Sequence, residues 1–199
     1  MDQGDLNQFG LALPPHLAEN DKRILLRQLL GFPSQSGFFG VVEDNEPVQG
    51  DAWRGFRILS PTSGEYEAVS GIVVSNSCDL AAANDPEPDQ NIVFAPLVDL
   101  HLYENLLLQE GQTEAEVGSK LDQIRKQQIH RIFFVPENGS FGGESMILMD
   151  DLHTQPLNEL SRFPMERLFS LSNYGWYVFL MKLSVHFTRM TDGVPRRAL

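Results

Sequence analysis

Short apolar stretches rich in β-branched and aromatic residues alternate with turn-like segments through the middle of the chain. The turns are rich in Pro, Gly, Asn and Asp, and no long helical pattern separates the first three stretches. Strands that follow one another so closely favour an antiparallel sheet over a parallel sheet with helical crossovers. The predicted strands cover residues 53–59, 67–75, 91–98, 130–135 and 145–152.

Helical periodicity is confined to the two ends of the chain and to one internal insertion. Residues 20–30 place leucines on one face, between a polar N-cap residue and a glycine. The insertion, at about residues 101–128, holds two helical stretches that Gly111 separates. Apolar residues recur at helical spacing from Trp176 to Met190, and a proline at an early position predicts a short helix over residues 164–171.

Together these elements predict an α+β fold. We expect a small antiparallel bent sheet or SH3-like β-barrel, with an N-terminal helix, a helical insertion and a long C-terminal helix. The 199 residues are 42% hydrophobic and 21% charged and show no linker, which predicts a single domain over residues 1–199. Within it, residues 36–155 form the β-rich core, and helices at residues 164–190 pack on that core.

The chain is acidic, with 27 Asp and Glu against 15 Lys and Arg and a formal charge of −12. This balance weighs against a general nucleic-acid binder and favours a basic or amphipathic protein partner. A single cysteine permits no internal disulfide, and the acidic N-terminus is unlike a signal peptide. The longest nearly apolar run, residues 176–183, is far shorter than the roughly 20 residues that cross a bilayer. We therefore expect a cytoplasmic protein without a membrane segment.

One predicted strand ends in a run of small polar residues that contains the only cysteine. A buried strand that ends in hydrogen-bonding side chains can place a site at the edge of a sheet, so this run is the predicted binding edge. A catalytic thiol needs a base or a cation nearby, and an adjacent carboxylate has the opposite effect. A structural role, with a small apolar thiol and a turn-capping carboxylate, is therefore favoured over catalysis. The run consists of Ser75, Asn76, Ser77, Cys78 and Asp79.

A second polar cluster ends the strand predicted at residues 145–152. Asp151 and His153 lie two positions apart and would face the same side of a strand, where they could bind a metal with a further ligand. One strand supplies too few ligands, and the chain has no HExxH motif and no paired cysteines. A solvated strand end is therefore favoured, and we expect no metal and no cofactor.

Five short motifs occur in order over about a quarter of the chain. They are Gly50-Asp51 before Trp53, Pro61, Gly64-Glu65, Val73-Val74-Ser75-Asn76 and Val93-Phe94-Ala95-Pro96-Leu97. In this order they resemble the PemK/MazF-type toxin family, which implies a small SH3-like barrel. Where the family has Arg-Pro, this chain has Ser70-Gly71, so the arginine that would serve RNA cleavage is missing there.

The main functional expectation is a non-enzymatic binding or adaptor protein of bacterial type, in a toxin–antitoxin or defence-like system. Catalytic motifs are absent, and the loops at residues 75–79 and 84–90 would contact a protein partner. Two enzymatic alternatives stay open. One is a diverged PemK/MazF-like endoribonuclease, with RNA as its substrate, that uses the edge Ser75–Asp79 with Glu65 or Arg57. The other is a metal- or small-molecule-dependent enzyme that uses Asp79, Asp151 and His153.

Overall fold

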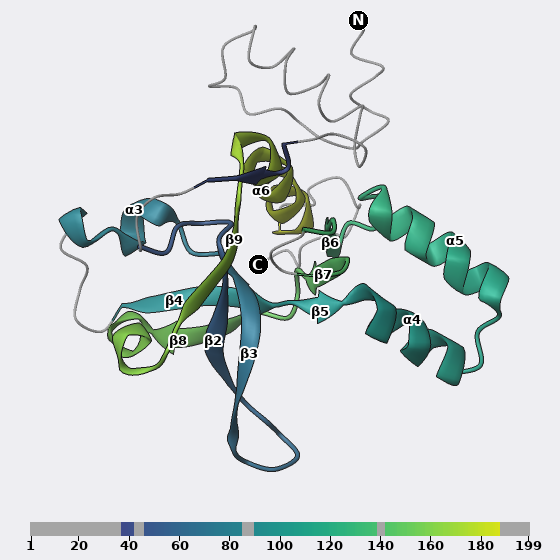
Figure 1. Cartoon of the computed structure of the whole chain (residues 1–199), viewed down its shortest axis with the longest axis horizontal. Coiled ribbons are helices and arrows are strands. Elements are labelled where there is room, and N and C mark those ends of the chain that lie inside the picture. The colour runs from purple at the N-terminus through teal and green to yellow at the C-terminus, as the bar shows by residue number, and fades with distance from the viewer. Residues whose placement is uncertain (1–36, 42–45, 85–89, 139–141, 188–199) are drawn as a thin grey trace, which may run out of the picture.

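The computed structural model describes residues 37–41, 46–84, 90–138 and 142–187 (Figure 1). The helix predicted over residues 20–30 lies outside these ranges. Within them, no helix is both long and apolar enough to span a membrane.

A six-stranded antiparallel sheet forms the larger part of the molecule. Its strand order is β1-β9-β2-β3-β4-β8, and it curls into a half-barrel (Figure 1). The aromatic rings of Phe56 and Phe94 stack inside the curl, with their centroids 4.1 Å apart. The strands are β1 (Phe39–Gly40), β2 (Ala52–Leu59), β3 (Tyr66–Val73), β4 (Asn91–Pro96), β8 (His153–Pro156) and β9 (Glu166–Leu171).

A glycine bulge in β2 produces much of the bend. The register between β2 and β3 shifts around Gly55, whose φ is +113°. A Cβ at this position would lie 2.6 Å from the carbonyl oxygen of Pro164, so both the conformation and the close approach require glycine. The bend brings β8 back toward β2, where the backbone N–H of Arg57 donates to Oε1 of Gln155 (3.1 Å).

Asp51, in the Gly-Asp motif of the family resemblance, ties β9 to the start of β2. Its side chain is 1% exposed, and Oδ2 lies 3.2 Å from Nε of Arg167. Burial raises the pKa of this carboxyl group, against the lowering effects of the Ser170 hydroxyl, the Val48 backbone N–H and the Arg167 guanidinium. Asp51 is therefore a structural residue.

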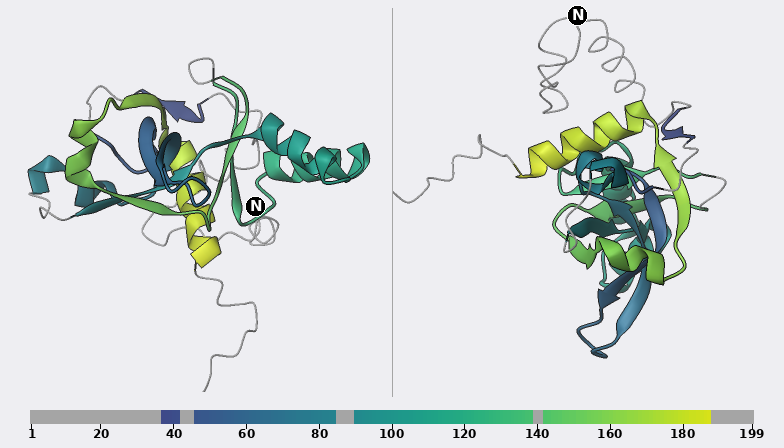
Figure 2. Two further views of the ribbon diagram at one scale, coloured as in Figure 1. Left: turned by 90° about the horizontal axis from the view of Figure 1, so that it is seen from below. Right: turned by 90° about the vertical axis from the view of Figure 1, so that its left-hand side faces the viewer.

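A smaller sheet carries the helical insertion. Its strand order is β5-β7-β6, with β5 at Val98–Asp99, β6 at Ile132–Val135 and β7 at Ser145–Leu148. Helices α4 (Leu100–Gln109) and α5 (Glu114–Arg125) form a hairpin that extends away from both sheets (Figures 1 and 2). A capping box between Thr113 and Glu116 begins α5, and three apolar residues of α5 pack on α4 and the small sheet.

Helix α6 (Asn173–Phe187) packs across the two sheets and completes the central core (Figure 2). Its Lys182 is 5% exposed, and Nζ donates to the carbonyl oxygens of Gln127 (3.0 Å) and Ile129 (2.7 Å). Burial lowers the pKa of this lysine to about 7. The lysine therefore holds the turn after α5 against α6.

The structure confirms the α+β class and the bent antiparallel sheet. The helical insertion also forms where the sequence predicts it. The short helix predicted over residues 164–171 is wrong, because Glu166–Leu171 forms strand β9 between β1 and β2. Pro164 suggested a helix start, but sheet pairing and the buried Arg167–Asp51 contact determine the local conformation.

Candidate functional site

The predicted binding edge forms a tight turn that its own side chains hold in place. Oγ of Ser75 accepts a hydrogen bond from the backbone N–H of Val93 (2.7 Å), and Oγ of Ser77 accepts one from that of Gln49 (3.0 Å). Oδ1 of Asn76 caps the short helix α3 (Ser77–Leu80) by accepting from the N–H two residues further on (2.9 Å). These three side chains join the turn to the chain around it.

The last two residues of this edge keep exposed side chains. The thiol of Cys78 is free, and the carboxylate of Asp79 makes no ion pair with the described residues. Their backbone carbonyls accept hydrogen bonds from the side-chain amides of Asn84 (2.6 Å) and Gln90 (2.5 Å). Most of the loop predicted to bind at residues 84–90 lies outside the described residues.

Two other candidates, Glu65 and Arg57, lie away from this edge. Glu65 is at the exposed turn between β2 and β3, ten residues before Ser75. Ten residues of extended strand span about 33 Å. The Arg57 guanidinium lies 5.5 Å from the ring centre of Tyr66 and 4.6 Å from that of Phe163. The structure does not bring these residues together with the turn.

Asp151 and His153 do meet each other at the start of β8. Nε2 of His153 lies 3.0 Å from Oδ1 of Asp151, and the imidazole stacks on Phe94. Among the described residues, however, no group of three or more His, Cys, Asp or Glu side chains could hold a metal ion. The Asp–His pair is therefore not joined by Asp79 in this part of the chain.

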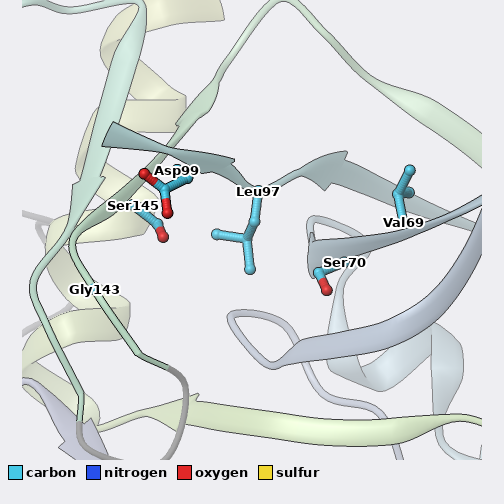
Figure 3. A pocket seen from close by; sticks show the side chains of 6 residues that line it. All are labelled: Val69, Ser70, Leu97, Asp99, Gly143 and Ser145. Carbon is cyan, nitrogen blue, oxygen red and sulfur yellow. The ribbon is translucent and has the colours of Figure 1, made fainter. Parts of the chain in front are cut away.

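A pocket of about 310 Å³ opens where the half-barrel meets the small sheet (Figure 3). Strand β3 supplies two of its residues, the β4–β5 segment supplies two, and the start of β7 supplies the rest. We call it the Asp99 pocket. It is lined by Val69, Ser70, Leu97, Asp99, Gly143 and Ser145.

The folding of α4 fixes the carboxylate of this pocket. Asp99 is the N-cap of the helix, and its Oδ1 accepts hydrogen bonds from the backbone N–H groups of His101 (2.8 Å) and Leu102 (3.1 Å). The other carboxylate oxygen makes no hydrogen bond to the described residues. The cap thus orients an acceptor that remains available at the pocket.

Two hydroxyl groups accompany the carboxylate. Ser145 is 3% exposed, yet the described part of the chain offers its Oγ no hydrogen-bond partner. In Figure 3 Ser145 lies on the same side of the pocket as Asp99, and Ser70 lies on the other side of Leu97. The Ser145 hydroxyl therefore lines the pocket beside a carboxylate, where it can donate a hydrogen bond to a ligand or accept one from it.

Among the described residues, no Lys or Arg lines the Asp99 pocket. The guanidinium of Arg125 approaches from α5, but it is held by Glu144 through hydrogen bonds of 3.0, 3.0 and 2.7 Å. These bonds raise the pKa of Arg125 and keep it protonated. The pocket therefore offers one carboxylate, which can accept a proton or a hydrogen bond, and two hydroxyls, which can donate or accept hydrogen bonds.

Sequence reasoning missed two of the polar residues in this pocket. In the sequence, Ser70 was considered only as the residue in place of the family's arginine. Asp99 and Ser145 belong to no motif. The available signal was the resemblance itself, because Asp99 lies two residues after Leu97, the last residue of the apolar-Pro-Leu strand end. An aspartate at a helix start also reads as a simple N-cap, and here the same residue serves as cap and lines the pocket.

No protein-family model matches the chain, and no curated protein matches it in sequence. Solved structures do match the chain. An endoribonuclease from a mycobacterial species is 14% identical, with a TM-score of 0.37, and the match covers 71% of this chain and 90% of that one. A MazE–MazF complex from Deinococcus radiodurans is also 14% identical, with a TM-score of 0.36, and the match covers 73% and 98%. The second of these structures contains MazF, a member of the family that the sequence resembles.

The main functional expectation is corrected at this point. The hypothesis of a non-enzymatic adaptor is contradicted, because one of the similar structures is an endoribonuclease and the other contains MazF. The endoribonuclease alternative is taken up below as a proposal.

Proposed function

We propose that the protein is a diverged endoribonuclease of the PemK/MazF type that cuts single-stranded RNA at the Asp99 pocket. The observation that carries the proposal is the position of this pocket. It opens on Ser70, the residue that stands where the family resemblance places the cleaving arginine, and it faces a carboxylate held in a fixed orientation.

The chemistry requires a proton acceptor for the ribose 2′-hydroxyl, and Asp99 can serve as one. When the proton moves to the carboxylate, the 2′ oxygen forms a bond to phosphorus and the bond from phosphorus to the 5′ oxygen breaks. The departing 5′ oxygen then takes up a proton through water. The products are a 2′,3′-cyclic phosphate and a 5′-hydroxyl, and DNA without a 2′-hydroxyl is not cut.

The two serines would bind the phosphate. Hydroxyls of Ser70 and Ser145 flank the pocket and can donate to its non-bridging oxygens. Neutral donors stabilise the developing negative charge less than a guanidinium does, and removing one good donor from such a site costs about 10²–10³ in rate. We therefore expect slow cleavage, which moderate salt should accelerate because it screens the repulsion between RNA and a chain with a charge of −12.

A cytoplasmic location and a protein partner belong to the same proposal. RNA substrates are present in the cytoplasm, and a ribonuclease there needs a protein that restrains it.

The test is a cleavage assay with a fluorescent single-stranded RNA, the purified protein and two matched variants. Asp99→Asn keeps an N-cap residue, so α4 should still form, and we expect at least a hundredfold slower cleavage. Asp79→Asn removes an exposed carboxylate from the turn and should leave the rate unchanged. If the wild-type protein does not cut RNA, or if both variants lose activity equally, the proposal is wrong.

A further inference from the structure

A second pocket, of about 240 Å³, shares no residue with the Asp99 pocket. Strand β2 supplies two of its residues, and the 3₁₀ helix η2 (Leu157–Arg162), which follows β8, supplies two more. The segments just before β2 and just before β9 supply one each. We call it the Trp53 pocket. It is lined by Pro47, Trp53, Phe56, Leu160, Ser161 and Met165.

Contacts outside the Trp53 pocket hold its two aromatic rings in place. The guanidinium of Arg167 lies 4.7 Å from the ring centre of Trp53. The ring of Phe56 stacks on that of Phe94, with the centroids 4.1 Å apart. The carbonyl oxygen of Pro164 packs closely on the glycine bulge of β2, which joins the segment before β9 to this strand. The pocket is therefore largely formed before a ligand binds, and binding need not order its walls.

The lining of the Trp53 pocket favours a neutral aromatic ligand. Five of its six residues are apolar, and none of the described residues that line it is charged. The Arg167 guanidinium, which contacts Trp53, is already paired with Asp51. A charged ligand would lose hydration here without an ion-pair partner, whereas a planar ring can pack its faces against Trp53 and Phe56.

The single hydroxyl of the Trp53 pocket gives the ligand a preferred polar group. Oγ of Ser161 donates to the carbonyl oxygen of Asn158 (3.2 Å), three residues earlier in η2. A serine hydroxyl has one hydrogen and two lone pairs, so Oγ of Ser161 is left as an acceptor. A ring with an N–H or O–H group at its edge therefore matches this position, and a ring that carries only acceptors does not.

We propose that the Trp53 pocket binds a small, neutral, planar aromatic ligand that donates one hydrogen bond to Ser161. An apolar cavity of about 150 Å³ holds benzene, so a pocket of about 240 Å³ has room for a molecule of two fused rings. A free aromatic compound and a nucleobase share this chemistry. The inference is independent of the proposed function, because none of the residues involved lines the Asp99 pocket.

Binding is measured by nuclear magnetic resonance on the full-length protein with isotope-labelled methionine methyl groups. Of the six methionines, Met165 lines the pocket, whereas Met149 is buried in the central core. A ring that enters the pocket shifts the methyl resonance of Met165 through its ring current. We expect indole to shift this resonance saturably and to leave that of Met149 unchanged, and Met165→Leu assigns the signal.

Two related probes test the hydrogen bond and the charge. Benzofuran has the size of indole but an oxygen in place of the N–H group, and we expect indole to bind about three- to tenfold more tightly. Ser161→Ala should remove this difference, whereas Ser119→Ala, at an exposed position of α5, should preserve it. Indole carboxylate, which adds a negative charge, should bind about tenfold more weakly than indole.

Adenosine distinguishes the two sources of the ligand. Its base offers an amino donor on two fused rings and is attached to a ribose. If adenosine binds more tightly than indole, the ligand is a nucleobase, and if indole binds more tightly, the ligand is a free aromatic compound. Either result confirms the pocket.

Three results would overturn the inference. They are an unchanged Met165 resonance with indole and adenosine, equal affinity for indole and benzofuran, and a preference for indole that survives in Ser161→Ala. The other methionine resonances show in the same spectra whether each variant is folded. Because no measurement contains RNA, failure here leaves the proposed cleavage untouched, and a protein that never cuts RNA can still confirm the Trp53 pocket.

Discussion

The turn at Ser75–Asp79 and the Asp99 pocket contain similar polar side chains, which differ in whether they have hydrogen-bond partners within the described chain. In the turn, the oxygens of Ser75, Asn76 and Ser77 all accept hydrogen bonds from backbone N–H groups. In the pocket, the hydroxyl of Ser145 and one oxygen of Asp99 have no such partner among the described residues. Polar groups that folding has already paired stabilise the chain, whereas unpaired groups in a fixed position remain available for a ligand.

Lys182 gives the largest expected effect on stability. Like the side chains of the Ser75–Asp79 turn, its Nζ is already paired by folding, because it donates to two backbone carbonyls. Its pKa is about 7 in the folded protein and 10.5 when exposed, so between these values only the unfolded chain keeps the proton. The free energy of unfolding should therefore rise from pH 7 to pH 10, by about 4 kcal/mol, and remain lower at and below pH 7.

Denaturant unfolding at several pH values checks this rise. Lys182→Met should flatten the profile between pH 7 and pH 10 without changing RNA cleavage at pH 7. Above pH 10 the buried phenol of Tyr174, whose pKa burial raises, should lower stability as pH increases. A wild-type profile that is already flat from pH 7 to pH 10 would contradict the assignment.

Ser70→Arg gives the largest expected effect on the pocket. It places a guanidinium where the resembling family has one, and we expect RNA cleavage to accelerate about a hundredfold. Ala68→Arg is the matched control, because it adds the same charge two residues away on the same face of β3, in the exposed first part of the strand. Equal acceleration by both variants would show that general attraction of RNA, and not the pocket, limits the rate.

Much of the fold follows from the sequence. Close spacing of the strands and the periodicity of the insertion predicted the antiparallel sheet and the hairpin of α4 and α5. Residues 166–171 were mistaken for a helix because their sheet pairing depends on β1 and β2, far away in the chain. The alternation of buried residues there is also short, so sequence alone gives a weak signal.

The candidate site was far less accessible to sequence reasoning. The pocket combines Ser70, Asp99 and Ser145 from strands of two different sheets, and no spacing along the chain reveals that they meet. The polar run at Ser75–Asp79 was predicted to be the binding edge because its residues are adjacent in the sequence. Adjacency of this kind is typical of a turn in which side chains cap the backbone.

A pair of serine variants compares the two regions directly. Ser75→Ala removes the acceptor of the Val93 N–H, so we expect unfolding to become easier by about 1–3 kcal/mol. Ser145→Ala removes a hydroxyl without a protein partner and should change stability by less than about 0.5 kcal/mol. Thermal unfolding measures both, and a larger loss for Ser145→Ala would show that its hydroxyl is a structural group after all.

Cys78→Ser should have the smallest effect. The thiol is exposed, and Asn76 and Ser77 hold the turn without it. We expect unchanged melting temperature and unchanged RNA cleavage, and iodoacetamide should alkylate the native wild-type protein without reducing its activity. If both the substitution and the alkylation abolish cleavage while the fold is retained, Cys78 acts in the reaction, and the catalytic edge is then the turn and not the Asp99 pocket.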